Sequence, residues 1–132
     1  MTGKRILHIE DNASNRKAVR HILRETGLEL CEAMDGEDGL RSALASPPDL
    51  ILLDIQLPRL SGYEVAQRLR AEDRTRHIPI IAITSYALSG DEQRAQDAGC
   101  DDYIAKPFRP RTLLEHIRRH LEEKIGDRSE GP

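Results

Sequence analysis

This sequence has little cysteine, no long apolar run and no excess of positive charge. Its two cysteines, Cys31 and Cys100, are too few for a disulfide framework or a zinc site. No apolar run approaches the roughly 20 residues of a membrane-spanning helix. The basic residues at the start of the chain are not followed by the apolar segment of a signal peptide. We therefore expect a cytoplasmic protein with reduced cysteines and no membrane partner.

The amino-acid composition is typical of a globular domain. The chain has 132 residues, of which 38% are hydrophobic and 33% are charged, and its formal net charge is -3. That length predicts a single domain without an effector or DNA-binding domain beside it. A mildly acidic domain is a poor nonspecific ligand for the phosphate backbone, so we expect no nucleic-acid partner.

Short apolar strands alternate with amphipathic helices along the chain. We expect strands at residues 5–9, 28–33, 50–53, 78–84 and 102–105. We expect helices at residues 12–26, from 35 to the proline pair at 47–48, from 61 onward, at 89–99 and from 110 onward. These strand-then-helix units predict an α/β fold, in which helices cover both faces of a doubly wound, five-stranded parallel sheet. Residues 125–132 are polar and predict a frayed tail.

Two helix starts have the spacing of a capping box, Ser61 with Glu64 and Ser89 with Glu92. The second of these helices offers only Ala95 to the core between residues 91 and 97. A helix with so little apolar surface is held weakly by packing. We therefore expect it to be a low-stability element that a signal can shift.

Strong polar side chains follow four of the five predicted strands. They are Glu10 and Asp11, Asp54, Thr84, and Lys106. In an open parallel sheet the functional site lies outside the carboxyl ends of the strands. We therefore expect three carboxylates, a hydroxyl group and an ammonium group to meet at one edge of the sheet.

Three neighbouring carboxylates repel one another, and a hard divalent cation removes that conflict. Mg2+ prefers oxygen ligands and shares its sites with phosphate oxygens. Asp11 and Asp54 are the expected ligands, with Glu10 holding a metal-bound water. A carboxylate can also attack phosphorus to form an aspartyl phosphate, and Lys106 and Thr84 supply partners for the phosphoryl oxygens. This pattern predicts Mg2+-dependent phosphorylation of Asp54.

Four segments resemble the response-regulator receiver domains of two-component signalling. They are residues 9–12, residues 48–54 followed by Pro58 and Gly62, residues 81–85, and residues 103–108. The resemblance covers residues 4–124. Residues 54–58, 90–92 and 98–101 are similar to single-domain regulators of the polar-differentiation type, and residues 10–15 resemble the receivers of hybrid histidine kinases.

The resemblance implies a flavodoxin-like fold with strand order 2-1-3-4-5. It implies that Asp54 is the phosphoacceptor and that Glu10, Asp11, Asp54 and the backbone carbonyl of Gln56 bind Mg2+. Thr84 and Lys106 would contact the phosphoryl group, and the Lys106–Pro107 peptide bond would be cis. On activation Thr84 would move toward the phosphate and Tyr103 would rotate inward behind it.

The resemblance also implies partners rather than a turnover reaction. A histidine kinase or a histidine phosphotransfer protein would donate the phosphoryl group, and a downstream protein target would bind the face made by the fourth helix, fifth strand and fifth helix. The chain would be a monomer or a weak phosphorylation-dependent dimer. The implied partner-binding residues are Asn15, Ala18, Ile22, Tyr86, Tyr103 and Pro107. Gln56 and Tyr86 would flank the path of the hydrolytic water, and the bulky Tyr86 predicts slow loss of the phosphoryl group.

Other functions share parts of this pattern. A phosphorelay shuttle and a phosphorylation-independent adaptor both remain open as alternatives. A flavodoxin-like FMN carrier is disfavoured because Glu10 and Asp11 would repel a phosphate. A haloacid-dehalogenase-type phosphatase is disfavoured because Gln56 stands where that family needs a second Asp.

The histidines and cysteines suggest structural roles. We expect His8 to be a hydrogen-bonded residue of the first strand. His116 and His120 lie one helical turn apart, but no acid or cysteine nearby in the sequence completes a site, so we expect them to be solvated. Cys31 and Cys100 are expected to be small buried residues.

Overall fold

The computed structural model describes residues 3–85 and 90–130, with side chains as far as residue 122. Strands and helices alternate throughout these residues. The strands are β1 (Arg5–Ile9), β2 (Glu29–Ala33), β3 (Leu50–Asp54), β4 (Ile80–Thr84) and β5 (Asp102–Ala105). The helices are α1 (Ala13–Leu23), α2 (Gly36–Ala45), α3 (Gly62–Ala71), α4 (Asp91–Ala98) and α5 (Pro110–Glu130).

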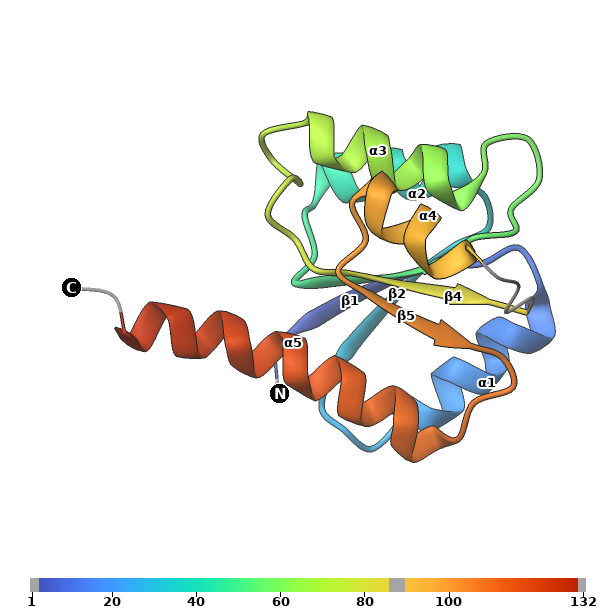
Figure 1. The fold of residues 1–132 in the computed structure, drawn as a ribbon. Coiled ribbons are helices and arrows are strands. Elements are labelled where there is room, and N and C mark those ends of the chain that lie inside the picture. The colour runs from blue at the N-terminus through green and yellow to red at the C-terminus, as the bar shows by residue number, and fades with distance from the viewer. Residues whose placement is uncertain (1–2, 86–89, 131–132) are drawn as a thin grey trace.

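The strands form one sheet in the order β2-β1-β3-β4-β5, and every neighbouring pair is parallel. This confirms the predicted order 2-1-3-4-5. Because all the strands run in the same direction, their carboxyl ends lie along one edge (Figure 1). The order reverses between β1 and β3, where functional residues gather in doubly wound sheets.

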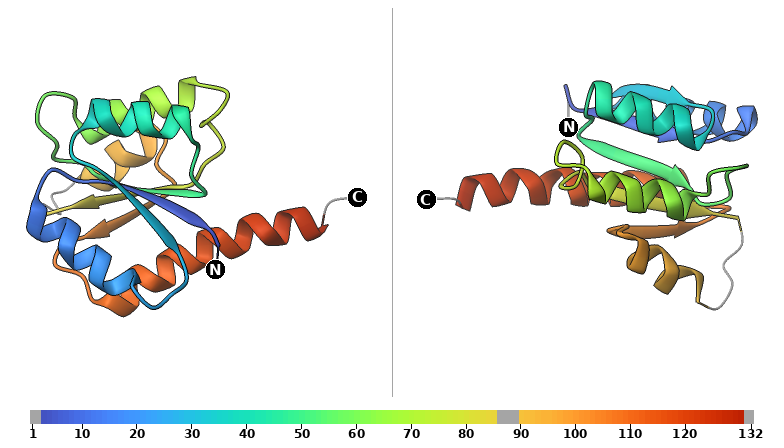
Figure 2. Two further views of the ribbon diagram at one scale, coloured as in Figure 1. Left: turned by 180° about the vertical axis from the view of Figure 1, so that it is seen from behind. Right: turned by 90° about the horizontal axis from the view of Figure 1, so that it is seen from above.

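Helices cover both faces of the sheet. Figures 1 and 2 show α1 and α5 on one face and α2, α3 and α4 on the other. Successive strand side chains point to opposite faces, so Leu50 and Leu52 pack toward α1 and α5, while Ile51 and Leu53 pack toward the other helices. All residues of β3 and of β4 are buried. This burial on both faces explains why these strands are continuous apolar runs in the sequence.

Side chains cap several of the helices. Ser61 and Glu64 form the predicted capping box at the start of α3. The predicted box at Ser89 lies outside the described residues. Within them, α4 begins after Gly90, whose φ of 94° is in the left-handed region.

The last helix, α5, runs on to Glu130 and projects beyond the sheet in Figure 1. One further expectation needs correction. His116 and His120 are not solvated, since both contact Asp102 at the start of β5. The acid lies on a neighbouring strand, so its proximity follows from the packing of α5 and not from local spacing. Among the described residues, no helix is long and apolar enough to span a membrane.

Candidate functional site

Three carboxylates meet at the carboxyl ends of β1 and β3. Glu10 and Asp11 follow β1 directly, and Asp54 is the last residue of β3. One oxygen from each of the three lies within 4.8 Å of the others. We call these residues the acid cluster. It is the arrangement that the sequence predicted for a Mg2+ site.

The acid cluster is unusually deep for charged side chains. Glu10 is 1% exposed and Asp54 is 4% exposed, whereas Asp11 is open to solvent. Burial raises the pKa of Asp54 to about 7, and the hydrogen bond and negative charge of Glu10 add to that rise. Burial works against ionisation of Glu10 too, but hydrogen bonds with Asp54 and Lys106 outweigh it and lower its pKa to about 2. The pKa of Asp54 therefore lies above the ordinary value of a carboxyl group, and that of Glu10 lies below it.

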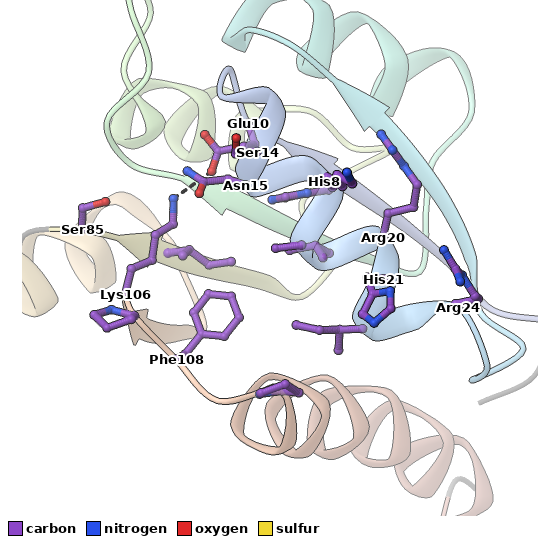
Figure 3. A pocket seen from close by; sticks show the side chains of 17 residues that line it. His8, Glu10, Ser14, Asn15, Arg20, His21, Arg24, Ser85, Lys106 and Phe108 are labelled. Carbon is purple, nitrogen blue, oxygen red and sulfur yellow. Dashed lines mark hydrogen bonds and ion pairs between the residues drawn. The ribbon is translucent and has the colours of Figure 1, made fainter.

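Lys106 reaches the acid cluster from the carboxyl end of β5, two strands beyond β3. Its Nζ donates to Oε1 of Glu10 at 2.8 Å (Figure 3). Its backbone N–H donates to the carbonyl oxygen of Thr84 at 2.7 Å, which ties the end of β5 to the end of β4. Thr84 is 1% exposed. The Lys106–Pro107 peptide bond is cis, as the resemblance implied.

The loop after Asp54 is held against the acid cluster. The backbone N–H of Gln56 donates to Oδ1 of Asp54 at 3.0 Å, and the Gln56 side chain accepts from the N–H of Ser85 at 3.1 Å. Gly62 closes the loop, and its N–H donates to the carbonyl oxygen of Ile55 at 3.0 Å. A Cβ on Gly62 would lie 2.5 Å from the Asp54 carbonyl oxygen, so only glycine fits this close approach.

Tyr103 lies on the α4 side of the sheet, one strand beyond β4. Its hydroxyl oxygen is buried, and the ring packs against the core under α2, α3 and α4. Burial raises the pKa of the phenol, the charges of Asp91 and Glu92 raise it further, and Thr84 acts in the opposite direction. Tyr103 is therefore already directed inward beside Thr84. That is the orientation which the resemblance assigned to the activated state.

A groove of about 950 Å³ lies between α1 and the loop from β5 to α5. Figure 3 shows this α1 groove, with the acid cluster residue Glu10 and Lys106 at one end. Its lining includes four of the predicted partner-binding residues, namely Asn15, Ala18, Ile22 and Pro107. Tyr103 does not line the groove and borders two smaller hollows instead. Tyr86 lies outside the described residues.

Sequence reasoning missed two features of this site. Arg16 donates to the backbone carbonyl of Glu10 at 2.8 Å and so helps to hold the acid in place. His8 lines the α1 groove, and burial lowers its pKa to about 4, which keeps the ring neutral. Within the described part of the chain, Nδ1 of His8 has no hydrogen-bond partner. The expected hydrogen bond of His8 is therefore missing at that nitrogen. No local motif marks either feature.

Comparison with known proteins agrees with this geometry. The family model described as "Response regulator receiver domain" matches residues 6–118. The chain belongs to the response-regulator receiver family. Members of this family are signalling proteins of two-component systems and not turnover enzymes. Receiver domains bind Mg2+ in their active site, and this chain has an acid cluster of three carboxylates.

Several relatives cover nearly the whole receiver. The chain is 42% identical over 118 residues to the polar-differentiation response regulator DivK of Brucella anthropi, covering 89% of this chain and 96% of that protein. It is 38% identical to the solved receiver domain of a sensor histidine kinase from Pseudomonas aeruginosa, whose active-site cleft coordinates a magnesium ion. The match to that structure has a TM-score of 0.85 and covers 92% of this chain and 99% of the solved chain. The chemotaxis protein CheY4 of Vibrio cholerae is 30% identical and matches with a TM-score of 0.84. The match covers 89% of this chain and 98% of the CheY4 chain.

Proposed function

We propose that this receiver accepts a phosphoryl group on Asp54 from the phosphohistidine of a kinase or a phosphotransfer protein. The observation that carries the proposal is the convergence of the acid cluster with Lys106 at one sheet edge. Asp54 is buried there beside Glu10 and Asp11, and the ammonium group of Lys106 contacts Glu10. Such a site is suited to phosphoryl transfer, which depends on positioning and on neutralisation of oxygen charge.

The residues of the acid cluster suit Mg2+. Glu10, Asp11 and Asp54 would hold the ion, Glu10 through a water, with the backbone carbonyl of Gln56 as a further ligand. Once bound, the ion would supply positive charge to the phosphoryl oxygens and to Asp54. Solvent reaches the cluster through Asp11, which leaves room for the waters that Mg2+ retains.

In the transfer itself, an Asp54 oxygen attacks the phosphorus atom of the phosphohistidine. A phosphorus–oxygen bond forms while the phosphorus–nitrogen bond breaks, and the leaving imidazole takes a proton from solvent. Lys106 exchanges its contact with Glu10 for one with a phosphoryl oxygen, and the Thr84 hydroxyl contacts another. Both changes place positive charge or a donor where negative charge accumulates.

The α1 groove would receive the donor protein. Its apolar lining suits a helix that presents aliphatic side chains, and it runs directly up to Lys106. Asn15, Ala18 and Ile22 present that lining from α1. This placement brings a donor histidine to the same edge of the sheet as Asp54.

The signal would leave through the face made by α4, β5 and α5. Thr84 would draw toward the phosphoryl group, and the change would pass to Tyr103 and α4 beside it. We further propose that the protein acts in the cytoplasm, as a monomer or a weak phosphorylation-dependent dimer, and that its output is a contact with another protein.

The test is phosphorylation by acetyl phosphate or phosphoramidate, with and without Mg2+, followed by intact mass measurement. We expect one phosphoryl adduct on the wild-type chain that depends on Mg2+ and is lost in Asp54→Ala. The exposed acid Asp73 gives a matched control, because Asp73→Ala should keep the adduct. A folded wild-type protein without an adduct would mean a phosphorylation-independent adaptor. Passage of the label to a histidine phosphotransfer protein would identify a phosphorelay shuttle.

A further inference from the structure

Two histidines of α5 and one aspartate of β5 form a cluster away from the phosphorylation site. Nδ1 of His116 lies 2.5 Å from Oδ2 of Asp102, and Nε2 of His120 lies 2.9 Å from the same oxygen. The other oxygen of Asp102 accepts from the backbone N–H of Tyr103 at 2.8 Å. We call Asp102, His116 and His120 the histidine cluster.

We propose that the histidine cluster is a second metal site, which binds Zn2+ through one nitrogen of each imidazole and Oδ2 of Asp102. Two imidazole nitrogens and a carboxylate oxygen form a ligand set that suits Zn2+, with water in the fourth position. Mg2+ prefers an all-oxygen set. The acid cluster and the histidine cluster therefore differ in the ions they select.

The carboxylate is ionised and already oriented for this role. Burial works against ionisation of Asp102, but hydrogen bonds from His116, Tyr103 and His120 outweigh it and hold its pKa below the ordinary value. The contact with the Tyr103 N–H fixes one oxygen, so the other faces α5. Supporting hydrogen bonds of this kind orient the ligands in metal sites.

The position of the cluster allows an ion to enter. The side chains of Asp102, His116 and His120 are 15%, 20% and 12% exposed, so they are mostly buried but not sealed. A hollow of about 440 Å³ opens beside His116. The guanidinium group of Arg119 lies 3.8 Å from Oδ2 of Asp102, but this side chain is 54% exposed and is free to turn toward solvent.

Metal binding would require the two imidazole rings to rotate toward a common point. Both imidazoles face the same oxygen, and an ion placed beside that oxygen would replace their two hydrogen bonds with bonds to the metal. His116 and His120 lie on the same side of α5, so the helix itself need not move. Bound Zn2+ would join α5 to β5 next to Tyr103, on the face from which we expect the signal to leave.

The site lies far from the acid cluster. Asp102 begins β5, whereas Lys106 follows the end of that strand, so the two clusters occupy opposite edges of the sheet. Binding at one can therefore be measured while the other is saturated. The inference also stands if Asp54 is never phosphorylated.

The test is calorimetric titration of the whole chain with ZnCl2 in the presence of saturating MgCl2. We expect one saturable Zn2+ site per chain. His116→Asn and His120→Asn should each abolish it, and Asp102→Asn should weaken it while keeping the hydrogen bond to Tyr103. His77→Asn is the matched control, since His77 is an exposed histidine outside the cluster and its loss should leave binding unchanged.

A second measurement needs no variant. Co2+ added to the wild-type protein should broaden the NMR signals of residues around Asp102, His116 and His120 while Mg2+ occupies the acid cluster. The proposal is overturned if no saturable Zn2+ binding occurs, or if binding survives in both histidine variants. It is equally overturned if the broadening is centred on another part of the molecule.

Discussion

The ammonium group of Lys106 lies 2.8 Å from Oε1 of Glu10, and the two residues are 96 positions apart in the chain. Lys106 follows β5 and Glu10 follows β1. In the sheet, β3 and β4 lie between these two strands. The ion pair therefore spans the sheet edge at which Asp54 lies. Glu10 is 1% exposed and Lys106 is 16% exposed, so solvent screens this pair only weakly. Lys106 therefore places a positive charge directly beside the acid cluster.

Replacing Lys106 by methionine should have opposite effects on folding and on metal binding. Lys106→Met leaves Glu10 buried without its cation, so the free energy of unfolding of the metal-free protein should fall by about 2 kcal/mol. The affinity for Mg2+ should rise, because a competing positive charge is gone. Urea unfolding and Mg2+ titration measure the two effects. The exposed Lys17→Met is the control, and a loss of Mg2+ affinity in Lys106→Met would contradict the competition.

Mg2+ binding should depend on pH through Asp54. Burial and the neighbouring Glu10 raise the pKa of Asp54 to about 7, so below that pH the ion must displace a proton. The Mg2+ affinity should increase roughly tenfold per pH unit up to about pH 7 and level off above it. Titrations across this range, with Asp73→Asn as the control, measure the slope. A flat profile would show that Asp54 carries no proton there.

The proton on Asp54 should also make the free energy of unfolding of the metal-free protein depend on pH. The folded chain binds it more tightly than the unfolded chain, in which Asp54 has its ordinary pKa of 3.8. Between about pH 4 and pH 7 the folded state thus holds more protons, so the free energy of unfolding should fall as the pH rises. Asp54→Asn should reduce this slope, and saturating Mg2+ should remove it. Chemical unfolding at several pH values is the measurement.

Gly62 should be needed for the geometry of the site as well as for stability. An alanine Cβ there would lie 2.5 Å from the Asp54 carbonyl oxygen and 2.5 Å from the Cα of Ile55, and backbone atoms cannot easily move aside. Gly62→Ala should cost about 3 kcal/mol and weaken Mg2+ binding. In the comparison variant Gly36→Ala, the atom closest to the added Cβ is a methyl carbon of Val65. That variant should lose stability but keep its Mg2+ affinity, and equal Mg2+ affinity in both variants would contradict this role of Gly62.

The sequence predicts most of the fold because its signals are local. Continuous apolar runs marked β3 and β4, since both faces of these strands are buried. The capping residues of α3 lie three positions apart and satisfy each other without help from the rest of the chain. The polar residues at the strand ends could be placed together because parallel strands share one edge.

Contacts between distant segments could not be predicted in this way. The meeting of Asp102 with His116 and His120 depends on how α5 packs on β5, and no spacing in the sequence encodes that packing. The unpartnered nitrogen of His8 likewise depends on what surrounds β1 in three dimensions.

Helix α4 should respond to phosphorylation, and Thr84 should be needed for that response. The only buried residues of α4 are Ala95 and Ala98, so little apolar contact holds this helix in place. Amide hydrogen exchange across residues 90–98 should change when the chain is phosphorylated with Mg2+ present, while exchange in α2 stays the same. α2 is the internal control because it packs mainly on β1, β2 and α3.

In Thr84→Ala the adduct on Asp54 should still form, but the exchange of α4 should no longer change, because the hydroxyl group that couples the phosphoryl group to Tyr103 is missing. Intact mass establishes the phosphorylation level of both proteins before their exchange is compared. An α4 response that persists in Thr84→Ala at equal phosphorylation would show that the signal reaches this helix by another route. An unchanged α4 in the phosphorylated wild type would show that weak packing alone does not make it a switch.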